Sequence, residues 1–277
     1  MKAVQKYLGF LAIPILLIVA ALLALVCENT LLELSPFWRF LFALVVSVVP
    51  GLLWLWFFYL EDKYEKEPKT YLIGIFILGG LLAFGISMPL ESAFGVYSLN
   101  VGASEFVKFL AAFFLIGGIK EFTKYVGVRY TVYYSDEFNE PADGIIYMAA
   151  SGLGFAAVYN FVYCISLQTI AVSVMSIRVV EQYLISAVFA GVTGYFMGHS
   201  KFRQKQKEIT MVLGFICAAF LNGTYRYLKD VIQGLQFEAW KNLVLSGVMV
   251  IFVYGILYVL LQRALDESKF KKEIVGE

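Results

Sequence analysis

A short charged stretch, Lys120-Glu121-Phe122-Thr123-Lys124, follows the apolar run Phe106–Ile119. Glu121 and Lys124 are three positions apart, so on a helix they share a face and can form an ion pair. Charges at membrane depth are costly and usually face the interior of a helix bundle, where they mark functional sites. A helix end at the interface, with the lysines reaching the headgroups, is an equally good interpretation. The stretch therefore provides candidate site residues whose setting the sequence leaves open.

A second segment, Asp136–Tyr163, changes from an acidic loop into an apolar helix at Pro141. Proline fits the first helical position because its missing N–H would have no partner there. The helix carries Asp143 and Asn160 together with several glycines and tyrosines. Small residues let membrane helices approach closely, and polar residues are costly there unless they are used. Asp143 and Asn160 are therefore further candidates, although Asp143 can equally serve only to stabilise the helix start.

Other charged and small residues have simpler interpretations. Arg226, in an apolar segment, either reaches outward or pairs with a buried acid such as Glu121. The mixed-charge segment Glu61–Lys69 is typical of a solvated loop, with Pro68 opening the next helix. Gly194 and Gly198 form a GxxxG pair, which favours close helix packing.

Composition indicates the elements that must position these residues. Of 277 residues, 60% are hydrophobic, against about 45–50% in a soluble domain, and the mean hydropathy is +0.76. A bilayer must therefore solvate much of the surface. Each apolar run approaches the ~20 residues that cross a membrane, unlike barrel strands of about 10. We expect an all-α polytopic bundle of about eight spans: Tyr7–Cys27, Trp38–Leu60, Tyr71–Leu90, Phe106–Val126, Ala142–Leu167, Gln182–Gly198, Thr210–Leu228 and Asn242–Leu261.

The basic residues predict an orientation for this bundle. With the N-terminus inside, sixteen of the 22 lysines and arginines lie on the inner side and six on the outer side, which follows the positive-inside rule. Both termini are therefore expected in the cytoplasm. Short connections predict one integral membrane domain over residues 1–277, with a polar tail at 266–277. Membrane lipids surround it, and the net charge of +1 gives no indication of a nucleic-acid partner. Nothing in the sequence predicts its oligomeric state.

Few residues could bind a metal through sulfur or imidazole nitrogen. The three cysteines, Cys27, Cys164 and Cys217, form no CxxC pair and are interpreted as packing residues. His199 is the only histidine, so one chain cannot build a multi-histidine centre. We therefore expect no metal and no cofactor.

Several motifs together resemble the PrsW-type intramembrane protease family, which is related to the CAAX prenyl proteases. The loop DKYEKEP is similar to that family's DxxEKEP element, and Asn139–Tyr163 to its acidic-Pro, DGxxY and LGFA block. SAVFAGVTGYFMG and LNGTYRYL resemble its last two helices. The resemblance covers about residues 58–227 and leaves an extra helix at 242–261. It implies a protein of the bacterial cytoplasmic membrane.

The resemblance also identifies the residues that depart from the family. In its EExxK motif Glu121 and Lys124 are retained, and these are the catalytic candidates. The remaining positions form a degenerate site, in which the first glutamate is replaced by Lys120, the glutamate of FxxxE by Tyr159, two histidines by Ser186 and Asn222, and a following acidic or amide residue by Arg226.

Members of the family are thought to activate water with carboxylates and histidines, as general bases or metal ligands. The replacements cannot take these parts, and Glu121 beside Lys124 is a weak base. We therefore expect a pseudoprotease that binds transmembrane or juxtamembrane segments of membrane proteins. An active peptidase using Glu121 with Asp143 or Glu181 is the first alternative. A protein that handles an anion or lipid at Lys120 and Arg226 is the second.

Overall fold

The chain forms a nearly all-helical bundle in a computed structural model that describes residues 30–94, 104–202, 206–234 and 239–268, with a few isolated positions before residue 28. The expected first span and most of the polar tail lie outside the described residues. The helices are α2 (Pro36–Glu61), α3 (Lys69–Leu82), α4 (Met88–Ala93), α5 (Glu105–Ala111), α6 (Ile119–Arg129), α7 (Pro141–Ser166), α8 (Val172–Phe202), α9 (Lys207–Gly234) and α10 (Ala239–Asp266).

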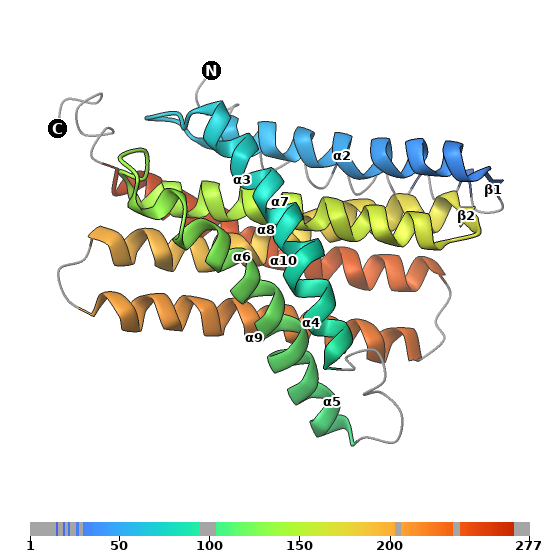
Figure 1. The fold of residues 1–277 in the computed structure, drawn as a ribbon. Coiled ribbons are helices and arrows are strands. Elements are labelled where there is room, and N and C mark those ends of the chain that lie inside the picture. Colours follow the sequence, from blue (N-terminus) through green and yellow to red (C-terminus); the bar gives the residue numbers. More distant parts are fainter. Residues whose placement is uncertain are drawn as a thin grey trace.

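Short π-helical segments join some of these helices end to end. Segment η1 (Ala83–Ser87) connects α3 to α4, and segment η2 (Ala112–Gly118) connects α5 to α6. A 3₁₀ turn, η3 (Val132–Tyr134), precedes α7. Two three-residue strands, β1 (Leu31–Glu33) and β2 (Thr169–Ala171), pair antiparallel. They lie at the end of the bundle where α2 begins and α7 ends (Figure 1).

Helix α7 is the centre of the bundle. It packs against α8, α3 and α2, and 83% of its most apolar 18-residue stretch is buried within the protein. Helices α3–α4 and α5–α6 cross the long helices obliquely (Figure 1). Because α7 is enclosed on several sides, its polar side chains face protein and not lipid.

Glycines allow the neighbouring helices to pack closely against α7. A Cβ at Gly144 would lie 2.2 Å from the carbonyl oxygen of Gly194, and one at Gly198 would lie 2.1 Å from that of Pro141. On another side of α7, a Cβ at Gly154 would lie 1.7 Å from the Phe76 oxygen of α3. The packing role predicted for Gly194 and Gly198 is therefore confirmed, and α7 and α8 approach backbone to backbone.

Within the part of the chain that the structure describes, five helical segments are long and apolar enough to cross a membrane: Pro36–Glu61, Lys69–Ala93, Pro141–Ser166, Val172–Phe202 and Lys207–Val231. These correspond to five of the eight expected spans, and the count of about eight is not confirmed. The expected span Phe106–Val126 is helical throughout, but it is not among these five, and it carries Lys108, Lys120, Glu121 and Lys124. The expected final span lies in α10, which the structure describes in part.

The segment Glu61–Lys69 is not simply a solvated loop. Asp62 is fully buried and Glu67 is 1% exposed. The backbone N–H of Glu67 donates to Asp62 Oδ2 at 3.1 Å, and Tyr147 of α7 donates its hydroxyl to Glu67 Oε2. These bonds fold the loop against the start of α7, which the charge pattern alone did not indicate.

Candidate functional site

Glu121 on α6 is a fully enclosed carboxylate of the predicted site, with 0% of its surface exposed. Its Oε1 atom lies 2.6 Å from Lys124 Nζ and accepts a hydrogen bond of 2.6 Å from Asn222 Nδ2 of α9. Lys124 is itself 1% exposed. The ion pair expected from the i, i+3 spacing therefore exists, and it lies in the interior of the protein and not at a helix end open to the headgroups.

Glycines on two elements bring Asn222 to this carboxylate. A Cβ at Gly117 of η2 would lie 2.2 Å from the Ala219 oxygen of α9, and one at Gly223 would lie 2.5 Å from Phe113 Cα. The two backbones therefore pack without intervening side chains, next to both Glu121 and Asn222.

A second carboxylate, Glu91 of α4, lies in the same polar network and is 2% exposed. Its Oε1 accepts a hydrogen bond of 3.0 Å from Ser87 Oγ and another from the hydroxyl of Tyr159. Ser87 Oγ and Tyr159 OH are also 3.1 Å apart. Lys120 Nζ lies 3.8 Å from Glu91 Oε2. Tyr159, where the resemblance implies a glutamate, thus donates its hydroxyl to an acid from another helix.

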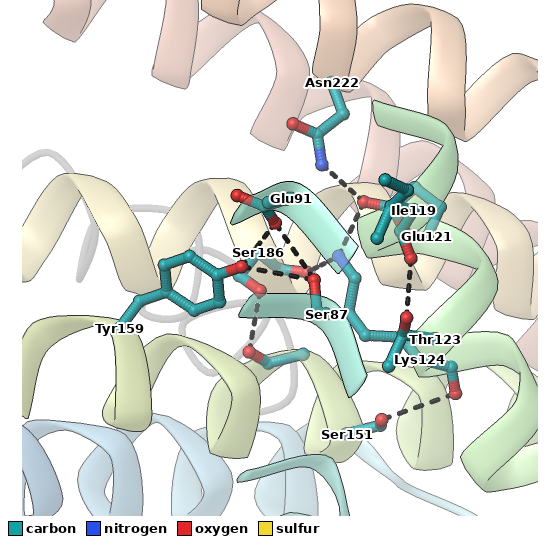
Figure 2. A network of polar contacts seen from close by, with 11 residues as sticks. Ser87, Glu91, Ile119, Glu121, Thr123, Lys124, Ser151, Tyr159, Ser186 and Asn222 are labelled. Carbon is teal, nitrogen blue, oxygen red and sulfur yellow. Dashed lines mark hydrogen bonds and ion pairs between the residues drawn. The ribbon is translucent and has the colours of Figure 1, made fainter. Parts of the chain in front are cut away.

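Two stacked rings connect these halves of the network. Phe155 and Tyr159 of α7 stack with centroids 4.9 Å apart. Lys124 Nζ lies 5.5 Å from the Phe155 centroid, and Lys120 Nζ lies 4.5 Å from that of Tyr159. Cations are attracted to ring faces at such distances. Lys124 also points to the Ser186 carbonyl oxygen at 3.5 Å (Figure 2), so each lysine is held by a carboxylate and a ring.

Both helices that supply acids carry a π-helical segment just before them. Segment η1 ends at Ser87, four residues before Glu91, and η2 ends at Gly118, three residues before Glu121. Such segments are frequent at functional sites because they shift the register of the side chains that follow. Here they precede the two carboxylates that Figure 2 places in one network.

Most of the residues that the sequence predicted lie together. Lys120, Glu121, Lys124 and Tyr159 belong to the network, with Asn222 on Glu121 and Ser186 beside Lys124. The hydroxyl of Ser186 donates to the Gly152 oxygen at 2.7 Å, so it holds α8 against α7.

Four predicted residues lie elsewhere. Arg226 is 44% exposed in its side chain and pairs with Asp230 at 3.1 Å, so it reaches outward and does not bind Glu121. Asn160 is buried beside Tyr183. Asp143 lies 16 residues before Tyr159, about 24 Å along a helix that rises 1.5 Å per residue, which separates it from Glu121. Glu181, the other acid expected to act with Glu121 in an active peptidase, pairs with Lys229 and accepts a hydrogen bond from Tyr225.

The sequence reasoning missed Glu91 and Ser87. The expected third span ended at Leu90, so Glu91 was counted as the first residue beyond it. Two signals were available. Ser87 and Glu91 are four residues apart, hence on one helical face, and Pro89 between them is typical of a distorted membrane helix.

At the opposite end of α7 lies a separate acidic group. Glu65, Glu67 and Asp143 each offer a carboxylate oxygen, and these three atoms lie within 4.8 Å of one another. It is the one group of three or more potential metal ligands among His, Cys, Asp and Glu in the part of the chain that the structure describes.

Comparisons with known proteins agree with the motif analysis. The PrsW family intramembrane metalloproteases match residues 67–259, a region that includes most of α10. Protease PrsW of Geobacillus kaustophilus is 33% identical over 189 residues, covering 68% of this chain and 80% of that protein. Protease PrsW of Oceanobacillus iheyensis is 31% identical over 185 residues, with 67% and 81% covered, and that of Bacillus subtilis is 29% identical over 196, with 70% and 85% covered. No solved structure matches the chain.

The description of that family names a metal, but the network around Glu121 does not fit one. Glu121 Oε1 already accepts from an ammonium and an amide, and Glu91 already binds Ser87, Tyr159 and Lys120. Two ammonium groups beside the carboxylates would repel a divalent cation. His199, the only imidazole, pairs with Glu267 at 3.2 Å near the end of α8. Tyrosine, serine and asparagine at the replaced positions do not supply the ligands of a zinc centre.

Proposed function

The chain belongs to the PrsW family of intramembrane proteases, and we propose that it is a catalytically degenerate member that binds transmembrane or juxtamembrane segments of other membrane proteins without cleaving them. The observation that carries this proposal is that both buried carboxylates of the network already accept hydrogen bonds or form ion pairs within the protein. Glu121 is held by Lys124 and Asn222, and Glu91 by Tyr159, Ser87 and Lys120.

Hydrolysis of a peptide bond inside a membrane needs a group that takes a proton from water. A carboxylate does this through an oxygen that is free to accept a hydrogen bond from that water. Glu121 Oε1 instead lies 2.6 Å from the ammonium of Lys124 and accepts a hydrogen bond from Asn222. Glu121 is therefore a poor base in this geometry.

The bundle stays closely packed around the network. Helix α7 keeps its glycine-mediated packing, and the charged groups of the network compensate one another in the interior. A segment of another membrane protein would be recognised by the same surfaces that an active relative uses. The curated relatives are named proteases, and that activity belongs to them.

One observation favours the second candidate, an active peptidase that uses Glu121. The Oε2 atom of Glu121 is buried and has no hydrogen-bond partner. A buried carboxylate oxygen without a donor costs about 1–3 kcal/mol or more, and a water held there would lie beside an acid. A crosslinking and cleavage experiment separates these two functions.

We would place this chain and the Geobacillus kaustophilus relative separately in proteoliposomes with a panel of single-span reporter proteins. A photo-crosslinking amino acid would replace Phe122, which is exposed on α6 next to Glu121, and in a control Phe252, which is exposed on α10. Reporters cut by the relative should crosslink to this chain from position 122, much less from position 252, and should stay intact.

Two results would contradict the proposal. Cleavage of a reporter by this chain that Glu121→Ala abolishes would establish the peptidase. Equal crosslinking from positions 122 and 252 would show that contact with the reporter is not specific to the site.

A further inference from the structure

A second site lies at the end of the bundle where α2 ends and α7 begins. Glu65 and Glu67 belong to the loop between α2 and α3, and Asp143 to the first turn of α7. One carboxylate oxygen of each lies within 4.8 Å of the other two. We call these residues the loop cluster.

Within the loop cluster, each buried carboxylate has one oxygen bound and one without a partner. Asp143 Oδ2 accepts the backbone N–H groups of Asn139 and Glu140, at 2.6 and 2.7 Å, and so caps α7. Glu67 Oε2 accepts from Tyr147. Asp143 Oδ1 and Glu67 Oε1 accept no hydrogen bond from a nitrogen or hydroxyl donor, although these residues are 0% and 1% exposed. The two carboxyl groups lie close enough to hydrogen-bond each other when one is protonated. The caps fix the orientation of the side chains, and the remaining oxygens lack a positive partner.

A fourth acid lies against the loop cluster. Asp62, also fully buried, uses Oδ2 to accept from the Glu67 N–H and leaves Oδ1 without a partner. Asp62, Glu67 and Asp143 are therefore three buried acids, each with one carboxylate oxygen that accepts no hydrogen bond from a nitrogen or hydroxyl donor.

The described lysines nearby are engaged elsewhere. Lys63 pairs with Glu61 at 3.6 Å, and Lys66 donates to the Tyr59 carbonyl oxygen at 3.1 Å. Lys201 lies within electrostatic range of Asp143, but its ammonium donates to the carbonyl oxygens of Tyr133, Ser135 and Phe138. Among the described residues, none forms an ion pair with a carboxylate of the loop cluster.

We propose that Glu65, Glu67 and Asp143 bind one hard divalent cation of the Mg²⁺, Mn²⁺ or Ca²⁺ class. Carboxylate oxygens are the ligands such ions prefer, and water completes their coordination. Glu65 is partly exposed and provides a route for the ion. The cation tethers the loop to the start of α7, far from the Glu121 network, and this inference does not rest on the proposed function.

The test uses the full chain, purified in detergent and treated with a chelator. Mn²⁺ is the probe, because free and bound Mn²⁺ differ in electron paramagnetic resonance. We expect saturable binding of one Mn²⁺ per chain, displaced by Mg²⁺ or Ca²⁺, and a higher unfolding temperature with the ion. Glu65→Gln should weaken binding at least about tenfold, in line with the loss of one ligand, and should leave the unfolding temperature without the ion unchanged. Glu208→Gln, which removes an exposed acid at the start of α9, should bind as the unaltered chain does.

Two outcomes would overturn the proposal. Absence of saturable Mn²⁺ binding would mean that Glu67 and Asp143 share a proton and bind no ion. Equal affinities for the unaltered chain and Glu65→Gln would place the ion elsewhere. Because the readout is ion binding, neither outcome bears on whether the chain cleaves membrane proteins.

Discussion

Glu91 Oε2 and Lys120 Nζ lie 3.8 Å apart, although one belongs to α4 and the other to α6. The resemblance to the EExxK motif implies a glutamate at the position of this lysine. A cation there without a partner would be costly in a low-dielectric interior. Glu91 supplies the opposite charge, and Tyr159, another replaced position, donates to the same carboxylate. Lys120 and Tyr159 therefore form one electrostatic unit with Glu91, an acid outside the motifs of the resemblance.

This unit predicts coupled stability effects. Glu91→Gln should destabilise the protein by about 3–5 kcal/mol, the typical cost of leaving one member of a buried pair without its partner. Lys120→Met should cost less, because Glu91 keeps the bonds from Ser87 and Tyr159. The double variant should recover part of the loss. Thermal unfolding in detergent measures all three, and additive losses would show that the two residues are independent.

The Glu121–Lys124 pair predicts a second cycle. Glu121→Gln should cost about 3–5 kcal/mol, since it leaves the buried ammonium of Lys124 without a negatively charged partner, beside only neutral groups such as the ring of Phe155 and the Ser186 oxygen. Glu121→Gln with Lys124→Met should be more stable than Glu121→Gln alone. Arg226→Met offers a matched control, because Arg226 pairs with Asp230 at the surface. Rescue of Glu121→Gln by Arg226→Met would contradict this arrangement.

Close packing of α7 predicts a different response at two glycines of the bundle. Gly154→Ala should destabilise by about 1–3 kcal/mol or more, because its Cβ would lie 1.7 Å from the backbone oxygen of Phe76. Gly74→Ala, on α3, meets nothing within 4 Å. It should be neutral or stabilising by about 1 kcal/mol, as expected from helix propensity. Unfolding temperatures measured side by side test this, and equal effects would mean that the helices separate easily.

The sequence predicted much of the fold because hydropathy reports directly on membrane helices. It located five spans that the structure supports and the start of α7 at Pro141. It also named Lys120, Glu121, Tyr159 and Asn222 as site residues from the resemblance, but their convergence became clear only from the contacts between the helices. It did not find Glu91, whose role depends on a contact between α4 and α7 over 68 positions of sequence. Nor did it predict burial of Asp62 and Glu67, because a charged loop looks solvated until tertiary packing closes over it.

Charge distribution predicts the orientation in the membrane. Cysteines introduced near Asn100 and Gln236 should react with an impermeant reagent added outside, and cysteines near Lys66 and Lys205 should not. Asn100, Lys205 and Gln236 lie outside the described residues, whereas Lys66 lies in the loop between α2 and α3. Lysis should expose the protected positions to the reagent. Labelling near Lys205 in intact cells would mean that the predicted orientation is wrong, since that connection contributes four of the sixteen inner positive residues.

Zinc content tests the chemistry of the network. A catalytic zinc ion usually has three protein ligands and a water. The network offers Glu91 and Glu121, each already bound by polar donors, with Lys120 and Lys124 beside them. We therefore expect less than stoichiometric zinc after purification and dialysis against a chelator, measured by elemental analysis. Glu121→Ala should leave the zinc content unchanged.

The location of any retained zinc decides between the two sites. One equivalent that Glu121→Ala releases would defeat the pseudoprotease proposal, because it would require Lys124 to leave the carboxylate it binds at 2.6 Å. One equivalent that Glu65→Gln releases would instead place the ion at the loop cluster, whose carboxylates carry no ammonium partner among the described residues. The two variants separate these results, since Glu121 and Asp143 are on different helices and far apart along the bundle.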